Sequence, residues 1–209
     1  MKNILFITAS FLIIGCGSET PEDGALVSVK KTPEITVNDY IYTLGEVTIK
    51  WTAFKHSAKA QVGGKFKSAE VKGFIESTNL STAISGVTFK IPVASTSTND
   101  EVRDYKIVNS FFNTMVDTDS ISGKILSIDE NGSGKLVINM NGQEVEKQYK
   151  WEMDQTNKEI YLKTSIDVLN WGAQSSLDAL NEVCLEQHTG PDGKNVLWPN
   201  VDITVIVDL

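Results

Sequence analysis

The side chains that most often do chemistry in proteins are few in this chain. Its two histidines, His56 and His188, lie in separate segments and have no HxxxH or CxxC companion. That spacing predicts no metal site, because metal ligands usually come in short, closely spaced motifs. No GxSxG sequence is present, and no Ser, His and acidic residue stand in a recognisable motif context. These residues predict a protein that is not an enzyme and that uses no cofactor.

A glycine-rich segment is similar to two ligand-binding loops and matches neither of them. The run GSGK at 132–135 lacks the upstream glycine of a phosphate-binding loop, and Leu136 follows it where Ser or Thr is needed. When the segment is counted as a calcium loop from Asp129, its twelfth position is Met140, where a bidentate Glu is required. We interpret the segment as a hairpin turn.

The first of the two cysteines, Cys16, follows a short apolar run. Residues 4–14 have about the length of a signal-peptide h-region and follow Lys2, whereas a membrane-spanning helix needs roughly 20 residues. The run ends in Ile13-Ile14-Gly15-Cys16, which resembles the lipobox of bacterial lipoproteins. In that class, cleavage before the Cys leaves it N-terminal and carrying lipid. The alternative is an ordinary Cys16 in an uncleaved signal anchor.

This resemblance predicts how the chain is divided and where it resides. Residues 1–15 are expected to be a signal peptide, and residues 16–40 a lipidated Cys16 followed by a flexible tether that is polar and contains Pro21 and Pro33. Residues 41–209 then form the folded domain. We expect an exported lipoprotein anchored to a membrane, either in the periplasm or at the cell surface.

The second cysteine, Cys184, is the only thiol left once Cys16 is modified, so no intramolecular disulfide can form. A reactive thiol would need a basic neighbour to become a thiolate. Leu177 and Leu180 stand at helical spacing before Cys184 instead. This pattern favours a buried, inert thiol over a nucleophile.

The overall composition excludes one class of partner. Of the 209 residues, 41% are hydrophobic and 22% are charged, which suits one globular domain. There are 19 basic and 27 acidic residues, so the net charge of −8 argues against binding to DNA or RNA.

Alternating apolar and polar residues recur along the folded part and predict strands with one buried face. The expected inward residues are Val47, Ile49, Trp51, Phe89, Ile91, Val93, Leu136, Ile138, Met140, Tyr149, Trp151, Met153, Ile160, Leu162, Ile166, Val168, Val201, Ile203, Val205 and Val207. Turn signals separate the strands at Gly63-Gly64, Asn131–Gly134, Asn141-Gly142 and Pro191–Gly193. The fold class is therefore all-β, with neighbouring strands antiparallel.

Two stretches break the alternation and predict short helices. The first follows a capping box, with Thr98 as N-cap and Glu101 reaching back to it, and ends near Phe111-Phe112. The second is expected to have Ser175 or Ser176 as its N-cap and to run to about His188.

Three blocks of sequence resemble the YceI-like family. They are residues 51–66 (WTAFKHSAKAQVGGKF), 93–98 (VASTST), and 102–105 (VRDY) leading into 110–112 (SFF). The resemblance extends over roughly residues 42–209. It implies an eight-stranded antiparallel lipocalin-like barrel whose interior holds a polyisoprenoid or another long-chain amphiphile. The segment 180–200 goes beyond the family pattern and leaves the shape of the barrel mouth open.

Large, adaptable apolar side chains are candidates to line such an interior, because methionines and aromatic rings suit a flexible apolar chain. The candidate ligand-binding residues are Trp51, Phe54, Phe66, Phe89, Ile91, Phe111, Phe112, Met115, Ile138, Met140, Trp151 and Met153. The same residues could also pack a solid core. Phe111, Phe112 and Met115 either line the opening or anchor the first helix. Arg103 and Asp104 either bind a headgroup or form a surface ion pair.

The function expected from these observations is that of a membrane-anchored binding protein. Its ligand is a long-chain apolar lipid, such as a polyisoprenoid or an isoprenoid quinone, held inside the barrel. The alternative is a lipid-anchored β-domain with a solid core that contacts a protein or a glycan through its outer face. The oligomeric state is left open.

Overall fold

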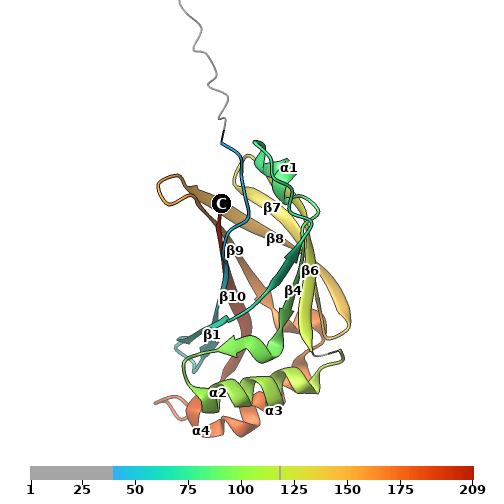
Figure 1. Cartoon of the computed structure of the whole chain (residues 1–209). Helices are drawn as coiled ribbons and strands as arrows, with labels where there is room; N and C mark the ends of the chain where they lie inside the picture. Colours follow the sequence, from blue (N-terminus) through green and yellow to red (C-terminus); the bar gives the residue numbers. More distant parts are fainter. Residues whose placement is uncertain (1–39, 118) are drawn as a thin grey trace, which may run out of the picture. The chain divides into compact units, whose positions relative to one another are not determined.

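The computed structural model describes residues 40–117 and 119–209, and the described residues belong to one compact unit (Figure 1). The predicted signal peptide (1–15), the lipidation site Cys16 and the predicted tether up to residue 39 lie outside the described residues. Tyr40 is the first described residue, and its hydroxyl donates to the backbone carbonyl of Leu209. The two ends of the described domain therefore meet.

The domain is built from ten strands and a few short helices. The strands are β1 (Val47–Lys55), β2 (Ala60–Phe66), β3 (Glu70–Lys72), β4 (Thr88–Pro92), β5 (Thr96–Ser97), β6 (Ser120–Asp129), β7 (Ser133–Met140), β8 (Gln143–Asp154), β9 (Glu159–Asp167) and β10 (Leu197–Asp208). The helices are α1 (Leu80–Ile84), α2 (Glu101–Lys106), α3 (Gln174–Val183) and α4 (Leu185–His188), and the tighter or wider helical turns are η1 (Val93–Ser95), η2 (Ile107–Phe111), η3 (Phe112–Thr114) and η4 (Val168–Trp171).

All ten strands belong to one antiparallel sheet in the order β3-β4-β6-β7-β8-β9-β10-β1-β2-β5. The chain links opposite ends of this order twice, from β2 to β3 and from β4 to β5, each time through three residues. Three residues span at most about 11 Å, so the sheet must curl until its two edges approach each other there. A hydrogen bond of 2.8 Å from the Lys67 amide to the Ser95 carbonyl joins the two links.

The all-β, antiparallel class is confirmed, but the expected barrel differs in two respects. The sheet has ten strands instead of eight, because β3 and β5 are short additional edge strands. Within the described residues no ladder joins β3 to β5, so the sheet is a curled half-barrel instead of a closed cylinder.

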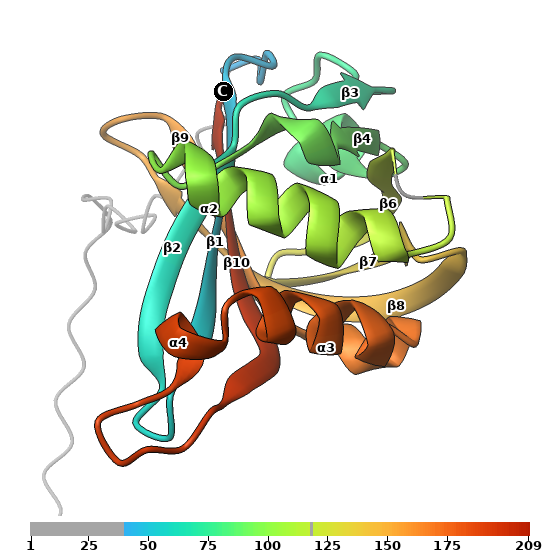
Figure 2. The ribbon, with the colours of Figure 1, turned by 90° about the horizontal axis from the view of Figure 1, so that it is seen from below.

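Three of the four α-helices gather at one end of the curled sheet (Figure 1). Seen from below, α2 with the turns that follow it lies beside α3 across that end (Figure 2). Two hydrogen bonds join the layers, from Lys106 Nζ to the Val183 carbonyl at 2.9 Å and from Thr114 to the Ser176 hydroxyl at 2.7 Å. Among residues 40–117 and 119–209, no helix has the length and hydropathy needed to cross a bilayer.

The first residues of the helices differ from the predicted ones, and the predicted capping residues do not cap them. Asp100, instead of Thr98, caps α2 by accepting from the Arg103 amide at 3.0 Å. No serine caps α3, which starts after Ala173, and the second predicted helix breaks at Cys184 into α3 and α4. The sequence pattern also missed α1, which Asn79 caps by accepting from the Thr82 amide.

Of the four predicted turns, those at Asn141-Gly142 and Pro191–Gly193 are correct, the one at Asn131–Gly134 is correct only for its first two residues because β7 begins at Ser133, and the one at Gly63-Gly64 is wrong. Asn141 and Gly142 both have positive φ, 52° and 66°, and connect β7 to β8 as a two-residue hairpin. Gly63-Gly64, in contrast, lies inside β2, and the turn between β1 and β2 falls at residues 56–59, where His56 and Lys59 have positive φ.

The reason for the misplaced turn is a pairing of aromatic rings with glycines across neighbouring strands. The pairs are Trp51 with Gly64, Phe89 with Gly123, and Tyr149 with Gly134. A Cβ atom built on each glycine would lie 2.2 to 2.3 Å from the ring. Each ring therefore packs directly on its glycine, which has no side chain to keep it away.

Candidate binding cavity

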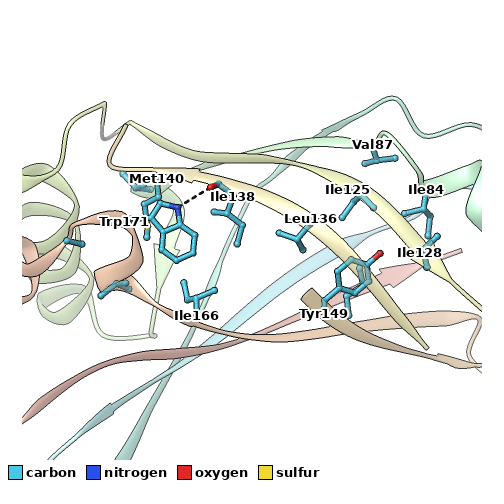
Figure 3. Close-up of a cluster of buried hydrophobic side chains, with 14 of the residues drawn as sticks. Ile84, Val87, Ile125, Ile128, Leu136, Ile138, Met140, Tyr149, Ile166 and Trp171 are labelled. Carbon is cyan, nitrogen blue, oxygen red and sulfur yellow. Dashed lines mark hydrogen bonds between the residues drawn. The ribbon is translucent and has the colours of Figure 1, made fainter. Parts of the chain in front are cut away.

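The inner face of the curled sheet encloses an apolar cavity, here called the inner chamber, with a volume of about 160 Å³. Its wall is formed by residues of every strand except β5, and Ile84 of α1 adds to it. Figure 3 shows Ile125, Leu136 and Ile138 among the side chains along this wall. A single buried water needs roughly 10 to 15 Å³ of such space, so this cavity is many times larger than one water site.

A second apolar cavity, the helix chamber, continues from the first toward α2 and α3 and has a volume of about 130 Å³. The two chambers share lining residues, which are Phe66, Ile121, Met140, Ile166 and Ile203. On β10 the combined lining of the two chambers runs from Val201 to Val207, which corresponds to about 20 Å of strand. The cavity is therefore elongated, as a chain-like ligand requires.

The hydroxyl groups that line the two chambers already have hydrogen-bond partners in the protein. In the inner chamber the hydroxyls of Tyr149 and Thr164 donate to the carbonyls of Ser127 and Gln148, each at 2.8 Å. Burial, and to a lesser degree the Asp129 carboxylate, raises the pKa of Tyr149 well above its usual value. The chamber thus offers an apolar ligand a wall without competing hydrogen-bond donors.

In the helix chamber, the polar atoms of Thr96 and Trp198 are also hydrogen-bonded to the protein. The Thr96 hydroxyl donates to the Val93 carbonyl at 2.7 Å, and the Trp198 indole donates to the His56 carbonyl at 2.8 Å. Both side chains line the chamber, and their polar atoms are engaged by backbone oxygens. Water gains little in such a space, whereas an apolar chain loses no hydrogen bond by entering it.

A third cavity, the mouth pocket, adjoins the helix chamber and differs from it in having charged and polar residues in its wall. It has a volume of about 190 Å³. It shares with the helix chamber a lining made of Trp51, Ala53, Ile107, Leu180 and Leu197. Its remaining wall carries charged and polar groups, which include Lys55, Asp100, Arg103, Lys106 and His188.

His188 is buried in this pocket, with 8% of its surface exposed. Its Nδ1 lies 2.8 Å from Asn181 Oδ1. Burial, with the nearby charges of Lys55, His56 and Lys106, lowers the pKa of His188 to about 4. The imidazole is therefore neutral near neutral pH. In the described part of the chain, no group of three or more His, Cys, Asp or Glu side chains could hold a metal ion.

The structure brings most of the predicted ligand-binding residues to the chambers. Those lining the inner or the helix chamber are Trp51, Phe66, Phe89, Ile91, Phe111, Phe112, Ile138 and Met140. Phe54 lines the mouth pocket. Three candidates lie elsewhere.

Met115 is buried but lines neither chamber, which agrees with anchoring of the helical turn. Trp151 and Met153 were expected to border the same space as Leu136 and Ile138, but they do not line it. The Trp151 indole donates to the Asp129 carbonyl, and Met153 lies near Tyr40 at the edge of the domain. Tyr149 is the one residue of β8 that lines the inner chamber.

The sequence pattern missed the contribution of the C-terminal part of the domain. Leu177 and Leu180 of α3 and the segment 197–199 all line the helix chamber. The helical spacing of the two leucines was visible, but it indicated cover for Cys184. Cys184 is indeed buried, at 7% exposure, and lies at the edge of the mouth pocket.

The predicted neighbours Arg103 and Asp104 have different partners from those expected. Arg103 lies 3.4 Å from the Asp100 carboxylate, and both side chains are nearly half exposed. Asp104 instead accepts hydrogen bonds from the amide and hydroxyl of Thr98, at 2.7 and 2.6 Å. Of the two residues, only Arg103 lines the mouth pocket.

Comparison with known proteins identifies a matching family model and solved structures with a similar fold. A family model described as YceI-like domain matches residues 27–207. The fold is similar to the crystal structure of Burkholderia cenocepacia BcnA, with 10% identity and a TM-score of 0.52 over 77% of this chain and 94% of that one. It is also similar to a polyisoprenoid binding domain from Saccharophagus degradans implicated in plant cell wall breakdown, with 11% identity and a TM-score of 0.54 over 77% of this chain and 91% of that one. No curated protein matches the sequence.

Proposed function

This chain belongs to the YceI-like family, and on that premise we propose that it binds a long-chain apolar lipid inside its curled sheet. A polyisoprenoid or an isoprenoid quinone fits the elongated space. The observation that carries this proposal is the pair of connected chambers with apolar walls and satisfied hydroxyls. The shared fold with a polyisoprenoid binding domain supports the same ligand class. The protein acts as a carrier or binder without catalysis.

Burial of the ligand's hydrocarbon chain can by itself drive binding. Each buried CH₂ contributes about 0.8 kcal/mol, so roughly twenty ligand carbons contribute about 16 kcal/mol before the cost of association. That cost is several kcal/mol or more, which still leaves a favourable balance. A charged anchor within the chambers is not required.

The N-terminal residues support a proposal about where in the cell the protein binds its ligand. The lipobox-like end at Cys16 supports an exported lipoprotein whose domain is held at a membrane by acyl chains. A binding domain tethered in this way could receive or deliver lipid near the bilayer.

The test compares two methionines that differ in their relation to the cavity. Met140 lines both chambers, whereas Met153 lines neither. Met140→Trp should fill the cavity and reduce the lipid that organic solvent extracts from the purified protein, with little change in melting temperature. Met153→Trp is the matched control and should retain the ligand.

A different result is expected if the protein does not bind lipid in its interior. If the interior is a solid core, Met140→Trp overpacks it and costs roughly 1 to 3 kcal/mol of stability. A large fall in melting temperature, together with no extractable lipid in the unmutated protein, would reject the lipid-binding proposal. It would favour a β-domain that contacts a protein or a glycan through its surface.

A further inference from the structure

The mouth pocket carries positive charge at the end of an apolar cavity. We propose that it binds the anionic headgroup, a phosphate or a carboxylate, of a single-chain lipid whose tail occupies the chambers. Lys55 and Lys106 are the residues assigned to the headgroup. This inference rests on the proposed function and narrows it from lipids in general to acidic amphiphiles.

The position of the pocket is the first support. The mouth pocket and the helix chamber share a wall made of Trp51, Ala53, Ile107, Leu180 and Leu197. The helix chamber in turn shares Met140 and Ile203, among others, with the inner chamber. A ligand whose tail fills the chambers can therefore place its polar end in the mouth pocket.

The charge of the pocket is the second support. Its charged lining residues are Lys55, Arg103 and Lys106 against Asp100, so three positive charges less one negative charge leave a net charge of +2. The whole chain has a net charge of −8. A positive site on an acidic protein selects anions near it, and Asp100 and Arg103 already neutralise each other as an ion pair. Lys55 and Lys106 remain as the excess charge.

The donors of both lysines are the third support. Lys55 Nζ donates to the Gln187 carbonyl at 2.8 Å, and Lys106 Nζ donates to the Val183 carbonyl at 2.9 Å. These contacts with the last turns of α4 and α3 fix the two ammonium groups at the pocket. An ammonium group has three donors, so each lysine retains two for an anion.

The surroundings strengthen the expected interaction. Both lysine residues are half-buried while the hydrogen bonds of their ammonium groups are exposed, so their charged ends are accessible to a ligand that reaches the pocket. In the described part of the chain, neither Lys55 nor Lys106 lies within 4.0 Å of a carboxylate. Their charges also contribute to the lowered pKa of His188, which agrees with both of them acting on the same pocket.

The test uses probes that share one tail and differ only in the headgroup. The parent protein is the full chain with Cys16→Ser, so that its own acyl chains cannot compete. Geranylgeranyl phosphate is compared with geranylgeraniol, and palmitic acid with hexadecanol, by displacement of a fluorescent apolar probe. The parent should bind at least one of the anionic probes about tenfold more tightly than its alcohol, as expected for charge-assisted hydrogen bonds.

Two double variants separate the pocket from the overall charge. Lys55→Gln with Lys106→Gln should remove the preference for the anion and leave alcohol binding unchanged. Lys50→Gln with Lys124→Gln changes two exposed lysines outside the cavity by the same total charge, and it should keep the preference. A preference shown only by the phosphate or only by the fatty acid would identify which anion the pocket accepts.

The negative outcomes are distinguishable. Equal binding of anion and alcohol by the parent, or a preference that survives in the Lys55/Lys106 variant, would overturn the headgroup assignment and leave the proposed lipid binding intact. If none of the four probes displaces the fluorescent lipid and no lipid can be extracted, the proposed function itself fails.

Discussion

His188 is a histidine that the fold keeps neutral. It is buried beside the positive charges of Lys55, His56 and Lys106, and its pKa is lowered to about 4. In the unfolded chain its pKa returns to about 6.5. The unfolded state therefore binds more protons between these two values, and the free energy of unfolding must fall as the pH falls through that window.

The resulting prediction is a pH-dependent loss of stability. Between about pH 7 and about pH 5, His188 alone should lower the free energy of unfolding by about 2 kcal/mol. Urea unfolding at the two pH values measures this difference. His188→Gln should make the difference much smaller, whereas His56→Gln should retain most of it because His188 is still buried. An unchanged pH dependence in His188→Gln would show that other groups are responsible.

At the scale of secondary-structure elements, the pairing of β1 with β2 shapes the cavity. Trp51 lies opposite Gly64, and a Cβ on that glycine would meet the indole at 2.2 Å. The neighbouring Gly63 has much more space, because its nearest neighbour would be the Trp51 carbonyl oxygen at 3.9 Å. The glycine under the ring allows the ring to pack directly on it, because no side chain keeps the ring away.

Substitution of these two glycines should therefore have different effects. Gly64→Ala should displace Trp51 into the cavity, lower stability by roughly 1 to 3 kcal/mol and weaken lipid binding. Gly63→Ala is the control and should change stability by much less. Urea midpoints and the near-ultraviolet circular dichroism of the tryptophans report both effects. Equal behaviour of the two variants would contradict the role given to the close ring contact.

At the scale of the whole molecule, the mouth pocket and the start of the described domain lie at opposite ends. Tyr40 bonds to Leu209, and the C-terminus lies at the end of the sheet away from α2, α3 and α4 (Figure 1). The mouth pocket, in contrast, is formed beside those helices. A headgroup bound in the mouth pocket, as proposed above, would therefore lie at the end of the domain opposite to Tyr40 and Leu209.

The predicted anchor can be tested in cells. Cys16→Ser should abolish acylation and move the protein from the membrane fraction to the soluble fraction, because acyl chains on Cys16 are the proposed anchor. Fractionation followed by mass spectrometry of the N-terminus measures both changes. Membrane association that persists, with an uncleaved N-terminus, would reject the lipoprotein assignment and favour a signal anchor.

The sequence alone was enough to determine the fold class and most inward-facing side chains. A strand places successive residues on opposite faces, so the alternation in β1, β7 and β10 indicated which residues face the interior without knowledge of their partners. The positions of Trp51, Ile138 and Met140 in the lining were predictable for this reason. The hairpin at Asn141-Gly142 was predictable because positive φ at both positions has a local sequence signature.

Only the tertiary structure decided where the cavity begins and ends. Alternation alone cannot show that Trp151 and Met153, on the same strand face as Tyr149, lie beyond the lumen, because that depends on how far the curled sheet extends along β8. The two glycines of β2 have the local sequence signature of a turn, and only the pairing of β1 with β2 places Trp51 against one of them. The mouth pocket joins Lys55 to Lys106 and His188, which are far apart in sequence. Long-range packing brings them together, and no local pattern encodes such a contact.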